Sequence, residues 1–193
     1  MAFLSQRATA IVQPKDTGAY LNPSRVPSGG SIRFHITSEE ALDFFEVWGT
    51  NTEGKLKPYR FSEEPTEEDI LAEMGNEFSR RENRDGTGFE APKHAIAFQC
   101  WNYETSAINI AQFSQKSLIR ELDKLTQIEE YADLSQWDFI LGKEGSGLTT
   151  EYSLTIVPMK KGSKEVIGKA MVEADEKGFD INRLLTGDNP FSA

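Results

Sequence analysis

Charged and aromatic side chains alternate along residues 55–61, a pattern suited to contact with nucleic acid. The run contains Lys55, Lys57, Tyr59, Arg60 and Phe61. Single-stranded nucleic acid is bound by this mixture, because cations follow the phosphates and rings offer stacking surfaces worth roughly 1–3 kcal/mol per base. The run therefore predicts a strand that contacts a single strand. The alternative is that its rings fill an interface between sheet faces.

A second pattern that could do chemistry is Asp43 followed by Glu53-Gly54-Lys55. An Asp about ten residues before a Glu-x-Lys can hold Mg²⁺ beside a cation, and the metal would activate water for phosphodiester hydrolysis. The segment 51–54 is equally well explained as a turn. A metal-dependent nuclease therefore stays an alternative behind nucleic-acid binding.

Other catalytic patterns are weak in this sequence. The two histidines, His35 and His94, have no acidic or cysteine partner nearby in the sequence, and no two Cys or His residues have zinc-ligand spacing. Gly142, Gly145 and Gly147 lack the Lys-Ser or Lys-Thr of a phosphate loop and suit a hairpin turn. We therefore expect a protein that is not an enzyme, with no catalytic residue, no metal and no cofactor.

Two apolar strands and a helix are predicted between residues 95 and 127. In the first strand, Ile96 and Phe98 alternate with Gln99 and Trp101, and Tyr103 continues the second face. The stretch 107–113 alternates again and predicts a β-hairpin, and Ser114 is a suitable N-cap for a helix to residue 127. The second face of the first strand adds Trp101 and Tyr103 to the candidate nucleic-acid contacts.

The remaining elements suggest a mainly β protein with helices. Further strands are expected at 31–36, 41–50, 55–61, 137–143 and 149–158, and helices within 62–90 and at 164–177. In the acidic helical insertion 62–90, Thr66 caps the helix with Asp69, and the apolar side contains Ile70, Leu71, Met74 and Phe78. We predict an N-terminal arm at 1–30, an OB-like antiparallel β-barrel at 31–160, and a C-terminal helix and tail at 161–193. The strand count exceeds the five of an OB barrel, so extra edge strands are required.

Composition and charge narrow the function classes. The chain has 193 residues, of which 38% are hydrophobic and 27% charged, with a net charge of −10, and this composition predicts a soluble globular protein. Three basic residues face ten acidic ones in 62–90, so most of the excess acid lies there. The acidic total disfavours nonspecific duplex binding but permits a local basic groove. No apolar run suits a membrane span or signal peptide, and a single cysteine weakly favours a reducing cytoplasm.

Two blocks of sequence resemble single-stranded DNA-binding proteins encoded by bacteriophages. The first block is Ala97-Phe98-Gln99-Cys100-Trp101-Asn102-Tyr103, then Ile108-Asn109-Ile110 and Gln115-Lys116-Ser117-Leu118-Ile119; the second is Asp138-Phe139-Ile140-Leu141, then the stretch 145–152 and Pro158. This resemblance covers roughly residues 55–160. It implies an OB fold and a role in coating single strands during phage DNA replication, recombination or repair. The expected location is then the cytoplasm of the infected bacterial host.

The C-terminus resembles the tail by which such proteins recruit replication enzymes. Asp188, Pro190 and Phe191 match its acidic and Pro-Phe character, although two residues follow the Phe. Lys143, at the end of a predicted strand, would extend the basic groove. The expected partners are single-stranded DNA and replication or recombination proteins. The main alternative is a phage protein-interaction module that binds a host or replication enzyme through its acidic helix.

Overall fold

The computed structural model describes residues 18–51, 53–75 and 79–192. Within these residues the chain is mixed α/β and mainly β, with nine strands and the helices α2 to α5. It divides into two compact units, which we describe separately. Unit 1 comprises residues 1–41 and 97–176, and unit 2 comprises residues 42–96 and 177–193.

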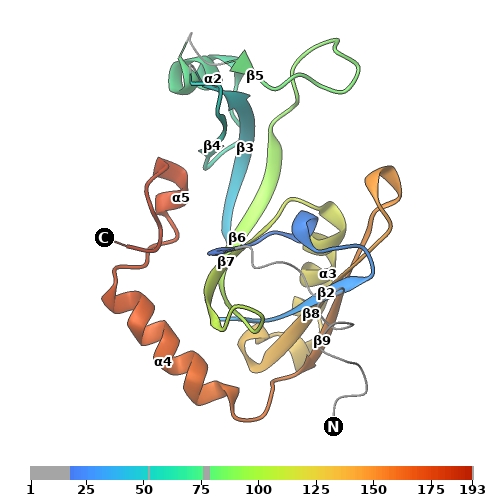
Figure 1. Cartoon of the computed structure of the whole chain (residues 1–193), viewed down its shortest axis with the longest axis vertical. Helices are drawn as coiled ribbons and strands as arrows, with labels where there is room; N and C mark the ends of the chain where they lie inside the picture. The colour runs from blue at the N-terminus through green and yellow to red at the C-terminus, as the bar shows by residue number, and fades with distance from the viewer. Residues whose placement is uncertain (1–17, 52, 76–78, 193) are drawn as a thin grey trace. The chain divides into compact units, whose positions relative to one another are not determined.

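The strands of unit 1 form an open, hydrogen-bonded path in the order β1-β7-β6-β2-β8-β9 (Figure 1). They are β1 (Tyr20–Leu21), β2 (Gly30–Ile36), β6 (Lys93–Asn102), β7 (Ala107–Phe113), β8 (Trp137–Glu144) and β9 (Glu151–Pro158). The first four residues of β6 belong to unit 2. Strand β2 lies between β6 and β8 and is antiparallel to both, while β1 is parallel to β7. Strands β8 and β9 form an antiparallel hairpin, as expected.

Phenylalanine rings fill the core of unit 1. Phe34 of β2 stacks on Phe139 of β8 with ring centroids 5.4 Å apart, and Phe98 meets Phe113 edge to face at 5.2 Å. The expected alternation of β2 is confirmed, because Ile32 and Phe34 are buried in the core while Arg33, on the other face, is half-buried. Because successive side chains of a strand point to opposite faces, Arg33 and His35 share the face away from these rings.

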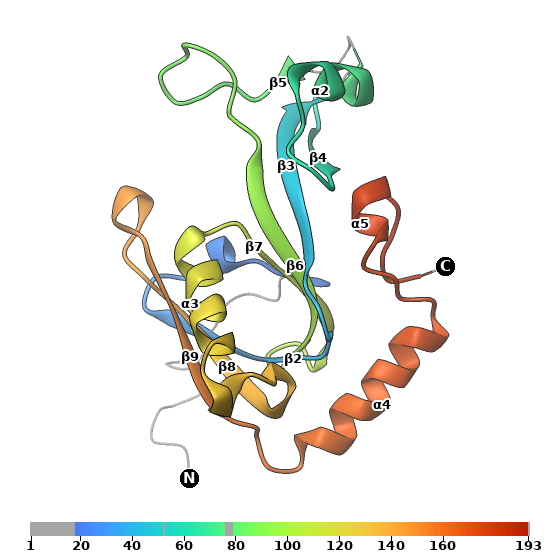
Figure 2. The same cartoon turned by 180° about the vertical axis from the view of Figure 1, so that it is seen from behind.

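Helix α3 (Lys116–Thr126) covers part of this core. It buries Leu118 and Leu122 and lies beside β7 and β9 (Figure 2). The expected cap at Ser114 is wrong, because the N-cap is Gln115 and makes no side-chain capping bond. Helix α4 (Ser163–Glu176) buries Ile167 and contacts β7. Short 3₁₀ helices complete the unit: η1 (Pro23–Arg25), η2 (Glu129–Tyr131), η3 (Leu134–Gln136) and η4 (Gly147–Thr149).

Unit 2 is built on β3 (Leu42–Thr50). This strand pairs antiparallel with β4 (Leu56–Phe61) and β5 (Ser79–Arg80), and also with β6. Helix α2 (Glu67–Met74) begins with a capping box between Thr66 and Asp69, which confirms the expected helix start. Its residues Ile70 and Met74 pack against Val47 of β3. The last helix of the unit is α5 (Arg183–Thr186).

The mainly β class with helices is confirmed. The acidic insertion expected at 62–90 contains a helix of eight residues that ends before Gly75, and Phe78 lies outside the described residues. Residues 79–90 return as a strand and a hairpin. Residues 62–90 belong to unit 2, together with the rest of 42–96 and the C-terminal segment 177–193. None of the described helices is long and apolar enough to cross a membrane.

Candidate nucleic-acid interface

The polar centre of unit 1 is the carboxylate of Asp138, which is fully buried. Asp138 is the second residue of β8 and lies opposite His35 of β2, and Arg33 lies two residues before His35 on the same strand. Because residues two apart on a strand share a face, both side chains reach the carboxylate. The pairing of β2 with β8 therefore builds this cluster on the face away from the phenylalanine core.

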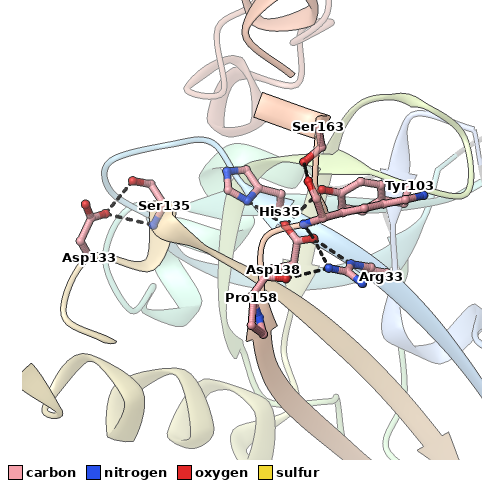
Figure 3. Close-up of polar contacts among 9 residues, drawn as sticks. Arg33, His35, Tyr103, Asp133, Ser135, Asp138, Pro158 and Ser163 are labelled. Carbon is pink, nitrogen blue, oxygen red and sulfur yellow. Dashed lines mark hydrogen bonds and ion pairs between the residues drawn. The ribbon is translucent and has the colours of Figure 1, made fainter. Parts of the chain in front are cut away.

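Four donors bind the two oxygens of Asp138 (Figure 3). Oδ2 accepts from Arg33 Nε at 2.7 Å and from the backbone N–H of Lys160 at 3.0 Å. Arg33 Nη2 forms an ion pair with Oδ2 at 2.6 Å and donates its hydrogen bond to the Pro158 carbonyl oxygen at 2.8 Å. Oδ1 accepts from the Tyr103 hydroxyl at 3.2 Å and lies 3.0 Å from His35 Nδ1. A carboxylate can only accept, so Nδ1 of His35 carries the proton. Every lone-pair direction of this buried charge is thus used.

Two cations lie close to the ring of Tyr103. The Arg33 guanidinium carbon lies 5.4 Å from its ring centroid, and Lys160 Nζ lies 5.5 Å away. The ring is half-buried and Lys160 is exposed. Burial raises the pKa of the Tyr103 hydroxyl, and the Asp138 carboxylate also raises it, so the hydroxyl stays protonated and donates. The arrangement is a fixed aromatic ring with positive charge beside it.

Trp101 does not offer a stacking surface. Only 6% of the residue is exposed, because β6 is buried on both faces from Ala95 to Asn102. The ring of Trp101, a residue expected to contact nucleic acid, packs edge to face on Tyr103 with centroids 6.4 Å apart. Lys143 is half-buried and donates from Nζ to the carbonyl oxygen of Ser24 at 2.8 Å.

The basic and aromatic residues of β4 belong to unit 2, whereas the Asp138 cluster belongs to unit 1. Lys57 is exposed, with Nζ 5.3 Å from the ring centroid of Tyr59. Lys55 is exposed as well and forms an ion pair with Glu53 at 2.9 Å. These two lysines remain accessible to an anionic ligand.

Arg60 and Phe61, both expected to contact nucleic acid, make contacts within unit 2. Arg60 forms an ion pair with buried Glu46 at 3.4 Å, and its side chain is only 14% exposed. It also donates to the carbonyl oxygen of Leu184 at 3.4 Å. Phe61 packs with Tyr59 against the cluster that includes Ile70 of α2. This packing of Phe61 and Tyr59 agrees with the alternative interpretation, in which the aromatic rings are packing residues.

The C-terminal residues fold back on themselves in unit 2. Pro190 is buried and its carbonyl oxygen accepts from the Asp180 N–H at 2.9 Å, while Phe191 meets Phe179 edge to face at 5.7 Å. Asp188 is exposed and accepts from the Thr186 hydroxyl. The expected Pro-Phe tail is thus packed, and it does not extend freely within the described residues.

The three residues of the nuclease pattern do not meet. Asp43 is near the start of β3, whereas Glu53 and Lys55 follow its end. The intervening strand spans roughly 20 Å at about 3.3 Å per residue. Asp43 instead contacts His94 Nε2, and no group of three potential metal ligands occurs among residues 18–51, 53–75 and 79–192. This arrangement gives the metal-dependent nuclease no support.

Four residues of the Asp138 cluster were missed as site residues from the sequence. They are Arg33, His35, Asp138 and Lys160. His35 was interpreted as an ordinary strand residue because its partner lies 103 positions away. The available signal was the placement of Arg33 and His35 on one face of a strand, which requires a polar partner or solvent on that face.

Comparisons with protein-family models, with curated proteins and with solved structures found no match to this chain.

Proposed function

We propose that this protein binds and coats single-stranded DNA without strong sequence preference, through an OB-like domain centred on unit 1. The role is non-catalytic and serves phage DNA replication, recombination or repair in the cytoplasm of the infected host. The sequence resemblance to phage single-stranded DNA-binding proteins gives the class of ligand. The observation that carries the proposal is the half-buried Tyr103 ring with two cations within 5.5 Å of its centroid.

The Tyr103 arrangement suits a base and its phosphates. A base can stack on a half-buried ring. The cations of Arg33 and Lys160 lie 5.4 and 5.5 Å from the ring centroid, close enough to contact the phosphate of a stacked nucleotide. Arg33 and the Lys160 backbone are fixed by Asp138, so little conformational entropy is lost on binding. Binding of this kind is preorganised and tolerant of sequence.

The strand connections of unit 1 are compatible with an OB-like barrel. If β2, β6, β7, β8 and β9 are the five barrel strands, the first strand pairs with the second and the fourth. Helix α3 then follows the third strand and precedes the fourth, as in the five-stranded Greek-key barrel that binds oligonucleotides. Strand β1, which pairs with β7, is an addition to this set.

Substitution of Tyr103 tests the proposal. Tyr103→Leu removes the stacking ring and is expected to weaken binding of a labelled thirty-base poly-dT by roughly 1–3 kcal/mol. Tyr103→Phe is the matched control, because it keeps the ring and removes only the hydroxyl, with its bonds to Asp138 and Ser163. Fluorescence anisotropy measures both. Equal affinities for Tyr103→Leu and the unsubstituted chain would refute the assigned contact.

A second candidate function is the protein-interaction module with α2 as its contact surface. Leu71 is 58% exposed on this helix, and Glu67, Glu68 and Asp69 form an acidic first turn beside it. An exposed apolar side chain among acidic residues suits a basic, amphipathic protein surface. The test is recovery of replication proteins with the tagged chain from infected cells. Loss of these proteins with Leu71→Glu would favour this function, and unchanged recovery would count against it.

A further inference from the structure

The hairpin of residues 80–90 in unit 2 carries an exposed aromatic ring on a buried arginine. Its two sides are joined by the Glu90 N–H bonding to the Arg81 carbonyl at 2.9 Å, by a bridge between Glu82 and Phe89, and by the Asn83 N–H bonding to the Gly88 carbonyl. The Arg81 N–H also donates to Trp48 of β3 at 2.8 Å. The hairpin is therefore held by its own backbone hydrogen bonds and by a backbone hydrogen bond to β3.

Phe89 is 55% exposed, and its ring lies over the Arg80 guanidinium with 4.9 Å between the guanidinium carbon and the centroid. Arg80 itself has a side chain only 7% exposed. It forms an ion pair with Glu67 of α2 and donates from Nη2 to the Glu90 carbonyl at 3.0 Å. Single exposed apolar residues are common on protein surfaces. This one differs because a buried cation with two further partners fixes the ring in place.

Two half-exposed cations lie near this hairpin although the protein is acidic. All seven charged residues of 62–78 are acidic, whereas 79–94 contains four basic and three acidic residues. Arg81 and Lys93 are each about half exposed, and both approach Glu90, at 3.7 and 3.3 Å. Glu90, which follows Phe89 in the chain, forms ion pairs with both cations and neutralises one of the two positive charges. A fixed ring with a net positive charge beside it matches a base and its phosphate better than it matches an apolar protein surface.

We propose that the 80–90 hairpin is a second binding element for single-stranded nucleic acid, in which a base stacks on Phe89 while Arg81 and Lys93 contact phosphate. This proposal rests on the proposed function, and it adds a contact in unit 2 to the Tyr103 contact in unit 1.

The test compares variants of the full chain by anisotropy with a labelled thirty-base poly-dT. Phe89→Ala is expected to weaken binding about five-fold or more, while Phe89→Trp keeps a ring and retains the affinity. Leu71→Ala is the matched control, because Leu71 is 58% exposed in the same unit but lies on the acidic helix. Arg81→Gln is expected to reduce the salt slope by about 0.7. An unchanged affinity in Phe89→Ala would overturn the proposal, and would leave this hairpin to a protein partner.

Photocrosslinking gives a second measurement on the unsubstituted chain. With 5-iodouracil in the oligonucleotide, we expect a crosslinked peptide that contains Phe89, in addition to one that contains Tyr103. A crosslink at Tyr103 without one at Phe89 would overturn the hairpin contact and leave the proposed function intact. The absence of any single-strand binding would remove the proposed function itself, so the two failures are distinguishable.

Discussion

Replacement of Asp138 by Asn should destabilise unit 1 strongly. The carboxylate is fully buried, binds donors from Arg33, His35, Tyr103 and Lys160, and forms an ion pair with Arg33. Asn keeps one acceptor oxygen and turns an NH₂ group toward donors, so several bonds are lost together. Removing one partner of a buried ion pair costs about 3–5 kcal/mol. Because the Arg33 side chain is 32% exposed and can be hydrated, we expect a value near the lower end, about 3 kcal/mol.

Thermal unfolding followed by tryptophan fluorescence measures this change. Trp101 and Trp137 lie in unit 1 and Trp48 lies in unit 2, so a Trp48→Phe background reports on unit 1. At about 2–4 °C per kcal/mol, Asp138→Asn should lower Tm by roughly 6–12 °C. Asp133→Asn is the control, since Asp133 is an exposed cap of η3 and should change Tm little. A Tm for Asp138→Asn within about 2 °C of the parent would refute the reasoning that this carboxylate holds the site together.

Three further predictions concern local features of the two units. Burial raises the pKa of the Cys100 thiol, so iodoacetamide at pH 8 should alkylate it only in denaturant, and rapid alkylation of the native protein would contradict this. Thr66→Ala should destabilise unit 2 by about 1 kcal/mol. Hydrogen bonds from Thr66 lower the pKa of Asp69. Urea titrations should therefore show the full difference in unfolding free energy between the two proteins above about pH 4, and a smaller difference as the pH falls further. Gly145→Ala should lower Tm by more than Gly147→Ala, because both glycines have positive φ but only at Gly145 does an added Cβ lie 2.2 Å from a backbone carbonyl oxygen. Equal effects of the two would argue against that close approach.

The local elements could be predicted from sequence because their signals are local. The alternation at 107–113 gives β7 with those bounds, and the Thr66 and Asp69 pair gives the start of α2. Helix α4 begins one residue before the predicted range. These features depend on periodicity and capping, which neighbouring residues determine.

The site was harder to predict because its partners are distant in the sequence. The alternation of β6 predicted that Trp101 lies on the surface. In the structure β6 pairs with other strands along its edges, and its side chains from Ala95 to Asn102 are buried on both faces. Arg60 looked like a phosphate contact, but Glu46 lies opposite it in the β3–β4 register. A strand sequence does not reveal which strand it will pair with, so neither burial nor ion pairing could be derived. Tyr103 is the predicted contact whose surroundings suit the proposed role.

Single-strand binding is tested most directly by anisotropy of a labelled thirty-base poly-dT oligonucleotide, titrated with the full chain at two salt concentrations beside a duplex of the same length. The proposed function predicts saturable binding to the single strand, weaker binding to the duplex, and affinity that falls with salt at a slope of about −0.7 per phosphate contact. Absence of single-strand binding at low salt, or equal affinity for the duplex, would contradict it.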